Sequence, residues 1–394
     1  MGKVIKGTDH ADTLTGTNGN DIIYGEGGND VITDNLGNDA LNGGSGNDVL
    51  TGGAGTNDYW GGSGADIVKV VGRAGAGYSD DLIHDFALGI DKINVSAWGI
   101  SSLDQIKDIV YLDSHNDTAF NAFYNGQDHV MRIADVTPGQ LTSSDFVFST
   151  SGPINETGTA HADVLFGSSG NDVLNGGDGD DILLGGDGND ILIGGNGLDD
   201  YNGGAGQDKV SYAYSADEGV KVDLAKGVAV FGDGAKESLV SIENVSGSQV
   251  ADTLKGTDGH NILGGLGGDD TLNGKGGNDI LIGGLGADTL TGGTGSDTFS
   301  YAALNESTVA ASGRDTITDF TSGDHIALTS LEANVGEAFH FIGDAAFTDV
   351  AGQLQYSIQN GNTFVNLDSN GDGKADFSIE LLGAHTLTAS DFLL

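Results

Sequence analysis

A nine-residue repeat fills three blocks of this 394-residue chain and constrains its fold more than any other feature. Residues 43–51 read GGSGNDVLT, and the next frame begins at residue 52. Seven such frames occupy residues 7–69, six occupy 158–211 and six occupy 247–300. The eighth position is apolar or aromatic in every frame, which a flexible Gly- and Asp-rich linker has no physical reason to maintain. Each block is therefore predicted to fold as a stack of repeated units.

The sixth position of the frame carries the predicted metal chemistry. It is Asp in seventeen frames and Asn in two, Asn57 and Asn261. Carboxylate and carbonyl oxygens are hard ligands, of which Ca²⁺ accepts about six to eight. We predict that the position-six aspartates bind Ca²⁺. They are Asp12, Asp21, Asp30, Asp39, Asp48, Asp66, Asp163, Asp172, Asp181, Asp190, Asp199, Asp208, Asp252, Asp270, Asp279, Asp288 and Asp297.

The repeat also predicts how the chain coils. Each frame is expected to supply a turn and a short strand, and two frames complete one coil, so each turn stacks on the turn two frames later. An ion between stacked turns would draw one carboxylate from each, as with Asp172 and Asp190. Asp270 and Asp288 form a second such pair. Glycine lets the turn carbonyls point inward. The expected carbonyl ligands are Gly43, Ser45, Gly176, Asp178, Gly185, Asp187, Gly274, Gly276, Gly283 and Leu285.

The predicted fold class is all-β. It is a parallel β-roll, that is, a calcium-stacked nonapeptide solenoid, in a duplicated roll-plus-cap arrangement with antiparallel β caps. The stacked turns of the three blocks would hold roughly a dozen Ca²⁺ ions.

The charge of the chain agrees with a calcium-dependent fold. It has 58 acidic and 15 basic residues, a formal net charge of −43 and no cysteine. The scattered basic residues exclude a nucleic-acid partner, which requires a basic face. No stretch approaches the roughly 18 apolar residues of a transmembrane segment. Without cations the stacked carboxylates repel one another, so we expect the rolls to be disordered until Ca²⁺ supplies their folding free energy.

Two segments outside the repeats resemble each other, which predicts a duplicated unit. DLIHDF at residues 81–86 parallels DTITDF at 315–320, and residues 133–148 align without a gap with residues 379–394. A solenoid needs such caps to cover its open ends. The predicted organisation is 1–69 first β-roll, 70–150 β cap, 151–157 linker, 158–211 second β-roll, 212–246 hairpin insertion, 247–300 third β-roll and 301–394 C-terminal β cap with a type I secretion signal.

Eight residues outside the repeats are further candidates for metal binding. Five flank the roll ends and are expected to complete a terminal site: Asp81, Asp85, Asp315, Asp319 and Asp324. Asp368, Asn370 and Asp372 begin the pattern D-x-[DN]-x-[DN]-G of an EF-hand loop. That loop lacks the Glu of its twelfth position, where an isoleucine stands, so a polar hairpin turn is the alternative.

The frame G-G-x-G-x-D-x-U-x resembles the calcium-binding repeat of RTX (hemolysin-type) secreted proteins, and the caps resemble the C-terminal region of serralysin-type proteases. The resemblance implies an extracellular protein of a Gram-negative bacterium, whose partner is a type I secretion exporter that reads an uncleaved C-terminal signal. The ending Asp391-Phe392-Leu393-Leu394 fits such a signal. Asp145-Phe146 repeats the pattern inside the chain, so the ending is also expected to be the last strand of a cap. Residues 1–6 contain no apolar run of a Sec-type signal peptide.

No known catalytic motif accompanies the repeats. The chain has neither the H-E-x-x-H of serralysins nor a G-x-S-x-G elbow or a Cys nucleophile. We therefore expect a non-enzymatic protein of adhesion, matrix or host contact. Two alternatives stay open. Rolls of this kind accompany alginate epimerases and rhizobial glycanases, so the protein would bind or modify an extracellular glycan, or it would be the C-terminal secretion part of a larger RTX enzyme.

Overall fold

The computed structural model describes residues 1–71, 78–124, 126–150, 152–214 and 219–394. The chain divides into two compact units, Met1–Gly206 and Gln207–Leu394. In the described residues each unit has one α-helix, α1 (Leu103–Ile109) and α2 (Thr329–Val335), and is otherwise built of strands. The all-β fold class is confirmed. The short 3₁₀ helices are η1 (Ser96–Trp98), η2 (Pro138–Gln140), η3 (Ser143–Asp145), η4 (Leu224–Lys226), η5 (Ala311–Gly313) and η6 (Ala389–Asp391).

The first unit begins with a parallel roll of two strand stacks. One stack is β1 (Val4–Lys6), β3 (Ile22–Tyr24), β5 (Ala40–Ser45), β7 (Asp58–Ser63) and β9 (Ser79–Ile83). The other is β2 (Thr13–Thr15), β4 (Val31–Thr33), β6 (Val49–Thr51), β8 (Ile67–Lys69) and β10 (Lys92–Asn94). Strands pair with the strand two frames later, so Val4 faces Ile22 and Thr13 faces Val31. Successive coils of the roll are thus eighteen residues apart, as the two-frame period predicts.

The eighth-position side chains form the interior of the roll. Ile23, Ile32, Leu41 and Leu50 are all 0% exposed. They point inward because a three-residue strand presents its central side chain to one face. Leu14 is the partly buried exception, since it lies in the first strand of its stack.

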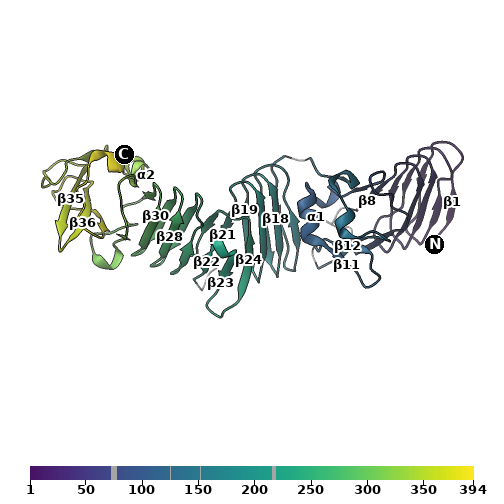
Figure 1. Cartoon of the computed structure of the whole chain (residues 1–394), viewed down its shortest axis with the longest axis horizontal. Helices are drawn as coiled ribbons and strands as arrows, with labels where there is room; N and C mark the ends of the chain where they lie inside the picture. The colour runs from purple at the N-terminus through teal and green to yellow at the C-terminus, as the bar shows by residue number, and fades with distance from the viewer. Residues whose placement is uncertain (72–77, 125, 151, 215–218) are drawn as a thin grey trace. The chain divides into compact units, whose positions relative to one another are not determined.

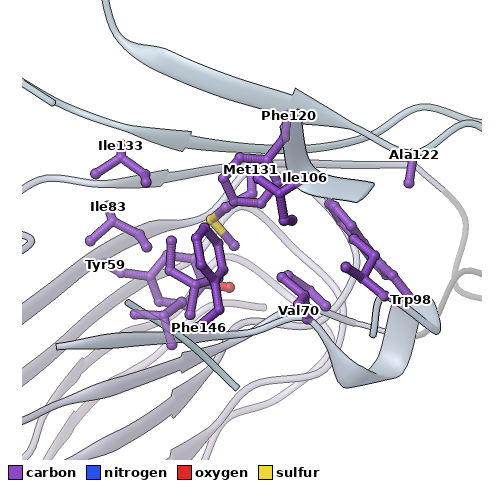
Figure 2. Packing of buried hydrophobic residues seen from close by; sticks show 14 of the residues in the cluster. Tyr59, Val70, Ile83, Trp98, Ile106, Phe120, Ala122, Met131, Ile133 and Phe146 are labelled. Atoms are coloured by element: carbon purple, nitrogen blue, oxygen red, sulfur yellow. The ribbon is translucent and has the colours of Figure 1, made fainter. Parts of the chain in front are cut away.

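The first cap continues the stacks of the first roll. Strand β13 (His129–Ile133) pairs in parallel with β9 and antiparallel with β12 (Thr118–Asn121), which pairs with β11 (Val110–Leu112). Strand β14 (Phe146–Val147) pairs with β10, and the rings of Phe120 and Phe146 lie 6.1 Å apart. Figure 2 shows Phe120, Met131 and Phe146 gathered in the core that covers the end of the roll.

A second roll completes the first unit. Its stacks are β15 (Asn155–Thr157), β17 (Val173–Asp178) and β19 (Ile191–Asn196), and β16 (Val164–Phe166), β18 (Ile182–Asp187) and β20 (Asp200–Ala205). Because β15 pairs with β17, residues 155–157 of the expected linker form the first strand of this roll, while residue 151 lies outside the described residues. The Gln105 amide in α1 donates to the carbonyls of Gly167 and Leu184 at 3.1 Å, which fastens the first cap to the second roll.

The second unit contains the third roll. One stack is β21 (Lys209–Ser211), β25 (Asn244–Ser246), β27 (Ile262–Gly267), β29 (Ile280–Leu285), β31 (Thr298–Ser300), β33 (His325–Ala327) and β38 (Phe392–Leu393). The other runs through β26 (Thr253–Lys255), β28 (Thr271–Gly276), β30 (Thr289–Thr294), β32 (Thr316–Ile317) and β37 (Phe377–Leu381). It continues antiparallel through β36 (Asn362–Asp368) to β35 (Gln353–Gln359), which pairs in parallel with β34 (His340–Phe341). Strands β28 and β30 are adjacent rungs in Figure 1.

The insertion between the second and third rolls is a small antiparallel sheet. Strands β22 (Lys221–Asp223) and β23 (Val228–Val230) form the expected hairpin, and β24 (Lys236–Val240) adds a third strand. Strand β22 pairs in parallel with β26, so the insertion extends one stack of the third roll. Residues 215–218 of this segment lie outside the described residues.

The two caps end in the same way. Phe146 pairs with Ile93 at the end of the first cap, and Phe392 pairs with Ile326 at the end of the second. Both Phe side chains are buried, 3% and 5% exposed. The Asp-Phe ending is therefore the last strand of a cap. Of the helices in the described part of the chain, neither is long and apolar enough to cross a membrane.

Candidate metal centres

Most position-six carboxylates accept a hydrogen bond from the turn one coil before them. The N–H of Asp172 donates to Asp190 Oδ1 at 2.8 Å, and the N–H of Asp270 donates to Asp288 Oδ1 at 2.8 Å. The same bond links Asp30 with Asp48, Asp163 with Asp181 and Asp279 with Asp297. The structure therefore brings the predicted pairs together as a carboxylate ladder.

The second oxygen of these carboxylates has no hydrogen-bond partner in much of the ladder. A buried charged oxygen without a partner costs free energy. A bound cation removes this cost, since it replaces the missing donor. The unpartnered Oδ2 atoms belong to Asp30, Asp39, Asp48, Asp66, Asp181, Asp270, Asp279, Asp288 and Asp297, each no more than 2% exposed.

The first-position carbonyls lie beside these oxygens. A Cβ added to Gly265 would overlap Asp270 Oδ2 and would lie 2.5 Å from the carbonyl oxygen of Gly283. This space, which the missing Cβ leaves open, therefore has a carboxylate on one side and a carbonyl on the other. The carbonyls of Gly43, Gly176, Gly185 and Gly274 meet a position-six side chain in the same way, at Gly25, Gly158, Gly167 and Gly256. We call such a space, between a position-six side chain and a first-position carbonyl, a cradle. All five predicted first-position carbonyls thus lie at a cradle.

The third-position residues also take part in pairing between coils, and their role as ligands stays a prediction. The carbonyls of Ser45 and Leu285 accept the N–H groups of Gly28 and Gly268 at 2.8 Å, which links successive coils. The other three predicted third-position ligands occupy paired positions in strands β17, β18 and β28. They are Asp178, Asp187 and Gly276.

Burial raises the pKa of several ladder carboxylates. The pKa of Asp270 rises to about 8, because burial and the nearby Asp288 and Asp252 disfavour its charge. The pKa of Asp181 rises to about 7 for the same reasons, with Asp199 as a neighbour. Hydrogen bonds from backbone N–H groups oppose these shifts. A cation between the carboxylates would displace protons from them.

The ladder continues into both caps. Asp315 Oδ1 accepts the N–H of Asp288 at 3.0 Å, so this predicted terminal residue joins the ladder. Asp319 instead uses both oxygens to accept the N–H groups of Gly292 and Gly293, at 3.0 and 2.9 Å.

The predicted Asp324 also joins the ladder, since its Oδ1 accepts the N–H of Asp297 at 2.9 Å. Asp91 does the same in the first cap, where its Oδ1 accepts the N–H of Asp66 at 3.0 Å, but it is absent from the predicted ligand set. Both precede the alternating strands that begin at residues 92 and 325. The similarity between the two caps is the sequence signal that connects Asp91 with Asp324.

The loop at residues 368–376 is satisfied by its own groups. The carboxylate of Asp368 accepts the N–H groups of Gly371 and Gly373 at 2.7 and 2.8 Å. Asn370 Oδ1 accepts the N–H of Asp372 at 2.9 Å. The candidate ligands Asp368, Asn370 and Asp372 are therefore engaged in a polar turn rather than turned toward one open position.

Tyrosine hydroxyls occupy two cradles of the rolls. The Tyr59 hydroxyl accepts the N–H of Gly52 at 3.0 Å, and a Cβ on Gly52 would meet this hydroxyl and the Asn57 side chain. The Tyr201 hydroxyl lies in the corresponding place at Gly194. A tyrosine at the eighth position is thus the sequence signal for a turn in which a hydroxyl takes the space.

Comparison with known families agrees with this geometry. The family described as RTX calcium-binding nonapeptide repeat matches in four copies, at residues 6–33, 34–68, 157–192 and 178–210. The family described as Peptidase M10 serralysin C terminal matches residues 238–394. No curated protein sequence matches the chain.

Three solved structures are similar to parts of the chain. The AlgE6R3 subunit of the Azotobacter vinelandii mannuronan C5-epimerase is 31% identical over 37% of this chain and 78% of its own, with a TM-score of 0.29. The AlgE6R2 subunit of the same enzyme is 31% identical over 39% of this chain and 92% of its own, with a TM-score of 0.30. The extracellular lipase LipA from Serratia marcescens is 18% identical over 59% of this chain and 40% of its own, with a TM-score of 0.23.

The stacked frames, their buried carboxylates and the cradles beside them define a calcium-binding β-roll protein. The chain belongs to the RTX family and carries a C-terminal region of the serralysin type. RTX nonapeptide repeats bind Ca²⁺, and proteins that combine these two features are typical type I secreted extracellular proteins.

Proposed function

We propose that the protein is a non-enzymatic calcium-binding protein that folds outside the cell and acts in adhesion, matrix or host contact. The observation that carries this proposal is the ladder of buried carboxylates whose Oδ2 atoms lack a partner. Folding of such a ladder is unfavourable in free energy at the low Ca²⁺ concentration of the cytosol, and the higher Ca²⁺ concentration outside stabilises it. A chain of this kind stays unfolded during export through a type I exporter and orders afterwards.

The proposed cofactor is Ca²⁺, at roughly a dozen ions per chain. Position-six carboxylates and first-position carbonyls supply the ligands. The turns at Gly52 and Gly194 lower the number, because a tyrosine hydroxyl takes the space beside the glycine.

Calcium-dependent folding is tested by circular dichroism of the full chain in EDTA and during calcium titration. We expect mostly coil in EDTA and a cooperative return of β signal with Ca²⁺. A chain that keeps its β signal in EDTA would overturn the proposal. Counting bound ions by mass spectrometry of the calcium-loaded chain then gives the stoichiometry.

A specific surface favours a second candidate function, the binding of an extracellular polysaccharide. A groove of about 280 Å³ on the first roll is lined by Ile22, Tyr24, Ala40, Asn42 and Trp60. These residues come from strands β3, β5 and β7 and point away from the interior that Ile23, Leu41 and Tyr59 fill.

Neighbouring side chains contact the two aromatic rings of this groove and hold them in place. Trp60 stacks on His84 with ring centres 4.3 Å apart and 2° between the planes. His84 Nε2 lies 2.7 Å from Asp58 Oδ1, and Lys6 Nζ lies 5.0 Å from the centre of the Tyr24 ring. A flat ring with a negative face attracts the C–H groups of a sugar. An uncharged glycan fits this surface best, because the net charge of the chain repels an acidic one unless Ca²⁺ bridges them.

Glycan-array binding in calcium, together with a polysaccharide-degradation assay, separates the two candidates. If the groove binds glycan, Trp60→Ala abolishes binding and Tyr214→Ala, a change at an exposed aromatic of the second unit, leaves it intact. If the wild-type chain binds no glycan, the proposed glycan partner is wrong and the role in adhesion, matrix or host contact stands. Turnover of polysaccharide would instead support an enzyme, or the secretion part of a larger RTX enzyme.

A further inference from the structure

One turn of the first roll departs from the repeat at its first position. The frame at residues 34–42 begins with Asp34, whereas the other eighteen frames begin with glycine. Asp34 is only 3% exposed. Its Oδ1 accepts the N–H of Asn35 at 2.8 Å, and its Oδ2 has no hydrogen-bond partner.

The carboxylate of Asp34 lies where other turns place a carbonyl. A Cβ added to Gly25 would overlap Asp30 Oδ2 and the carbonyl of Gly43, whereas a Cβ added to Gly16 would overlap the carboxylate of Asp34. At this turn a charged side chain has therefore replaced a neutral backbone ligand.

Three buried carboxylates meet at this turn. Asp21, Asp34 and Asp39 each offer an oxygen, and these three oxygens lie within 4.8 Å of one another. The side chains are 1%, 3% and 2% exposed. Two of them, Asp34 and Asp39, have an Oδ2 atom without a hydrogen-bond partner. Three buried carboxylates in so small a space cannot all be ionised unless a cation lies between them.

We propose that Asp21, Asp34 and Asp39 form a three-carboxylate cation site, the tightest site of the first roll. It binds a hard divalent ion such as Ca²⁺, and it binds a trivalent lanthanide more tightly than the two-carboxylate turns do. Affinity for hard cations rises with the number of charged ligands, and three carboxylates balance a +3 charge. The proposal rests on the calcium binding of the ladder proposed above, and it adds a rank order among its sites.

The next coil explains why an extra carboxylate is useful here. The N–H of Asp39 donates to Oδ1 of Asn57 at 3.1 Å, so the following position six carries an amide instead of a carboxylate. The hydroxyl of Tyr59 lies beside Asn57 in that cradle. Asp39 therefore lacks a carboxylate neighbour in the next coil, and Asp34 supplies one on the other side.

Terbium tests the site in the full chain. Crystals of the calcium-loaded protein are soaked in limiting Tb³⁺, and we expect the strongest anomalous peak among Asp21, Asp34 and Asp39. In solution, Tb³⁺ displaces Ca²⁺ stepwise and is followed by its luminescence. Asp34→Gly, which restores the residue of the repeat, and the near-isosteric Asp34→Asn should each weaken the first step by about tenfold or more. Asp9→Asn, at an exposed position of the same roll, is the charge-matched control and should leave that step unchanged.

The outcomes separate this proposal from the function on which it rests. If both Asp34 variants keep the first terbium step of the wild type, or if the strongest peak lies elsewhere in the ladder, the three-carboxylate site is wrong and calcium binding by the rolls stands. If neither Tb³⁺ nor Ca²⁺ binds the rolls, the proposed function itself is wrong.

Discussion

Asp288 Oδ1 accepts the backbone N–H of Asp270, eighteen residues earlier, at 2.8 Å, while Asp288 Oδ2 has no hydrogen-bond partner. One oxygen of the Asp288 side chain thus binds the preceding coil, and the other faces the cradle beside Gly283. The two roles are separable by mutation, because an asparagine keeps the acceptor and loses the charge. Asn57 already does this, since its Oδ1 accepts the N–H of Asp39.

Substitutions at Asp279 should separate the two roles. Asp279→Asn keeps the Oδ1 that accepts the N–H of Asn261, so we expect a weaker local ion, by on the order of tenfold, within an intact fold. Asp279→Ala should raise the calcium midpoint of folding further, because it also leaves the buried N–H of Asn261 without its acceptor. Calcium titration monitored by circular dichroism measures both midpoints.

The control for these variants is Asp200→Asn, at an exposed position of the second roll. It should leave the calcium midpoint unchanged. If the Asp279 and Asp200 variants behave alike, position six is not the ligand position.

The metal-free chain should gain structure in acid. Burial raises the pKa of Asp270 and Asp315 to about 8 and that of Asp181 to about 7, above the ordinary aspartate value. The folded state therefore binds more protons than the unfolded state. The stability contributed by protonation is complete below the unfolded pKa near 4 and is lost as the pH rises through the folded values. In EDTA, β signal should thus increase from pH 8 to pH 5.

A pH-titration of ellipticity in EDTA checks the sign of this effect. The same titration in saturating Ca²⁺ is the control and should be flatter over this range, since the metal replaces the protons. A metal-free chain that loses structure on acidification would contradict the burial of these carboxylates.

A methyl group in the cradle should displace an ion. A Cβ on Gly265 would overlap Asp270 Oδ2 and approach the Gly283 carbonyl to 2.5 Å, so Gly265→Ala fills the space between the two ligands. We expect one fewer bound Ca²⁺ by mass spectrometry and a higher calcium midpoint. Gly139→Ala is the matched control, because a Cβ there meets no atom within 4 Å. Equal calcium stoichiometry in the Gly265→Ala variant and the wild type would show that this cradle holds no ion.

The coil of the rolls could be predicted because its pattern is strictly periodic. The eighteen-residue register of Val4 with Ile22 follows directly from two nine-residue frames. Asp34 escaped prediction because its charge lies outside position six, and only the structure shows its carboxylate against Asp21 and Asp39. The hydroxyl of Tyr59 escaped for a related reason, since the pattern treats the eighth position as apolar and takes no account of where a ring places its polar end. Periodicity thus predicts the backbone, while departures from it determine the individual sites.

The final strand of the chain should matter for folding as well as for export. Phe392 is 5% exposed, pairs with Ile326 and has its ring centre 5.0 Å from that of Phe341. Its internal counterpart Phe146 is 3% exposed and pairs with Ile93. Phe392→Ala and Phe146→Ala should each destabilise the purified, calcium-loaded chain by about 3–5 kcal/mol, because both remove a buried ring. Thermal unfolding followed by circular dichroism measures the loss.

Export separates the two phenylalanines. In a Gram-negative host with a type I exporter, Phe392→Ala should lower the amount of chain in the medium, whereas Phe146→Ala should leave it near the wild-type level. The internal position supplies the control, since its cap is destabilised equally but it does not lie at the C-terminus. If both variants are exported like the wild type, the C-terminal Asp-Phe pattern serves the cap alone. If Phe392→Ala blocks export without lowering thermal stability, the residue acts in export and its packing against Phe341 contributes little to the fold.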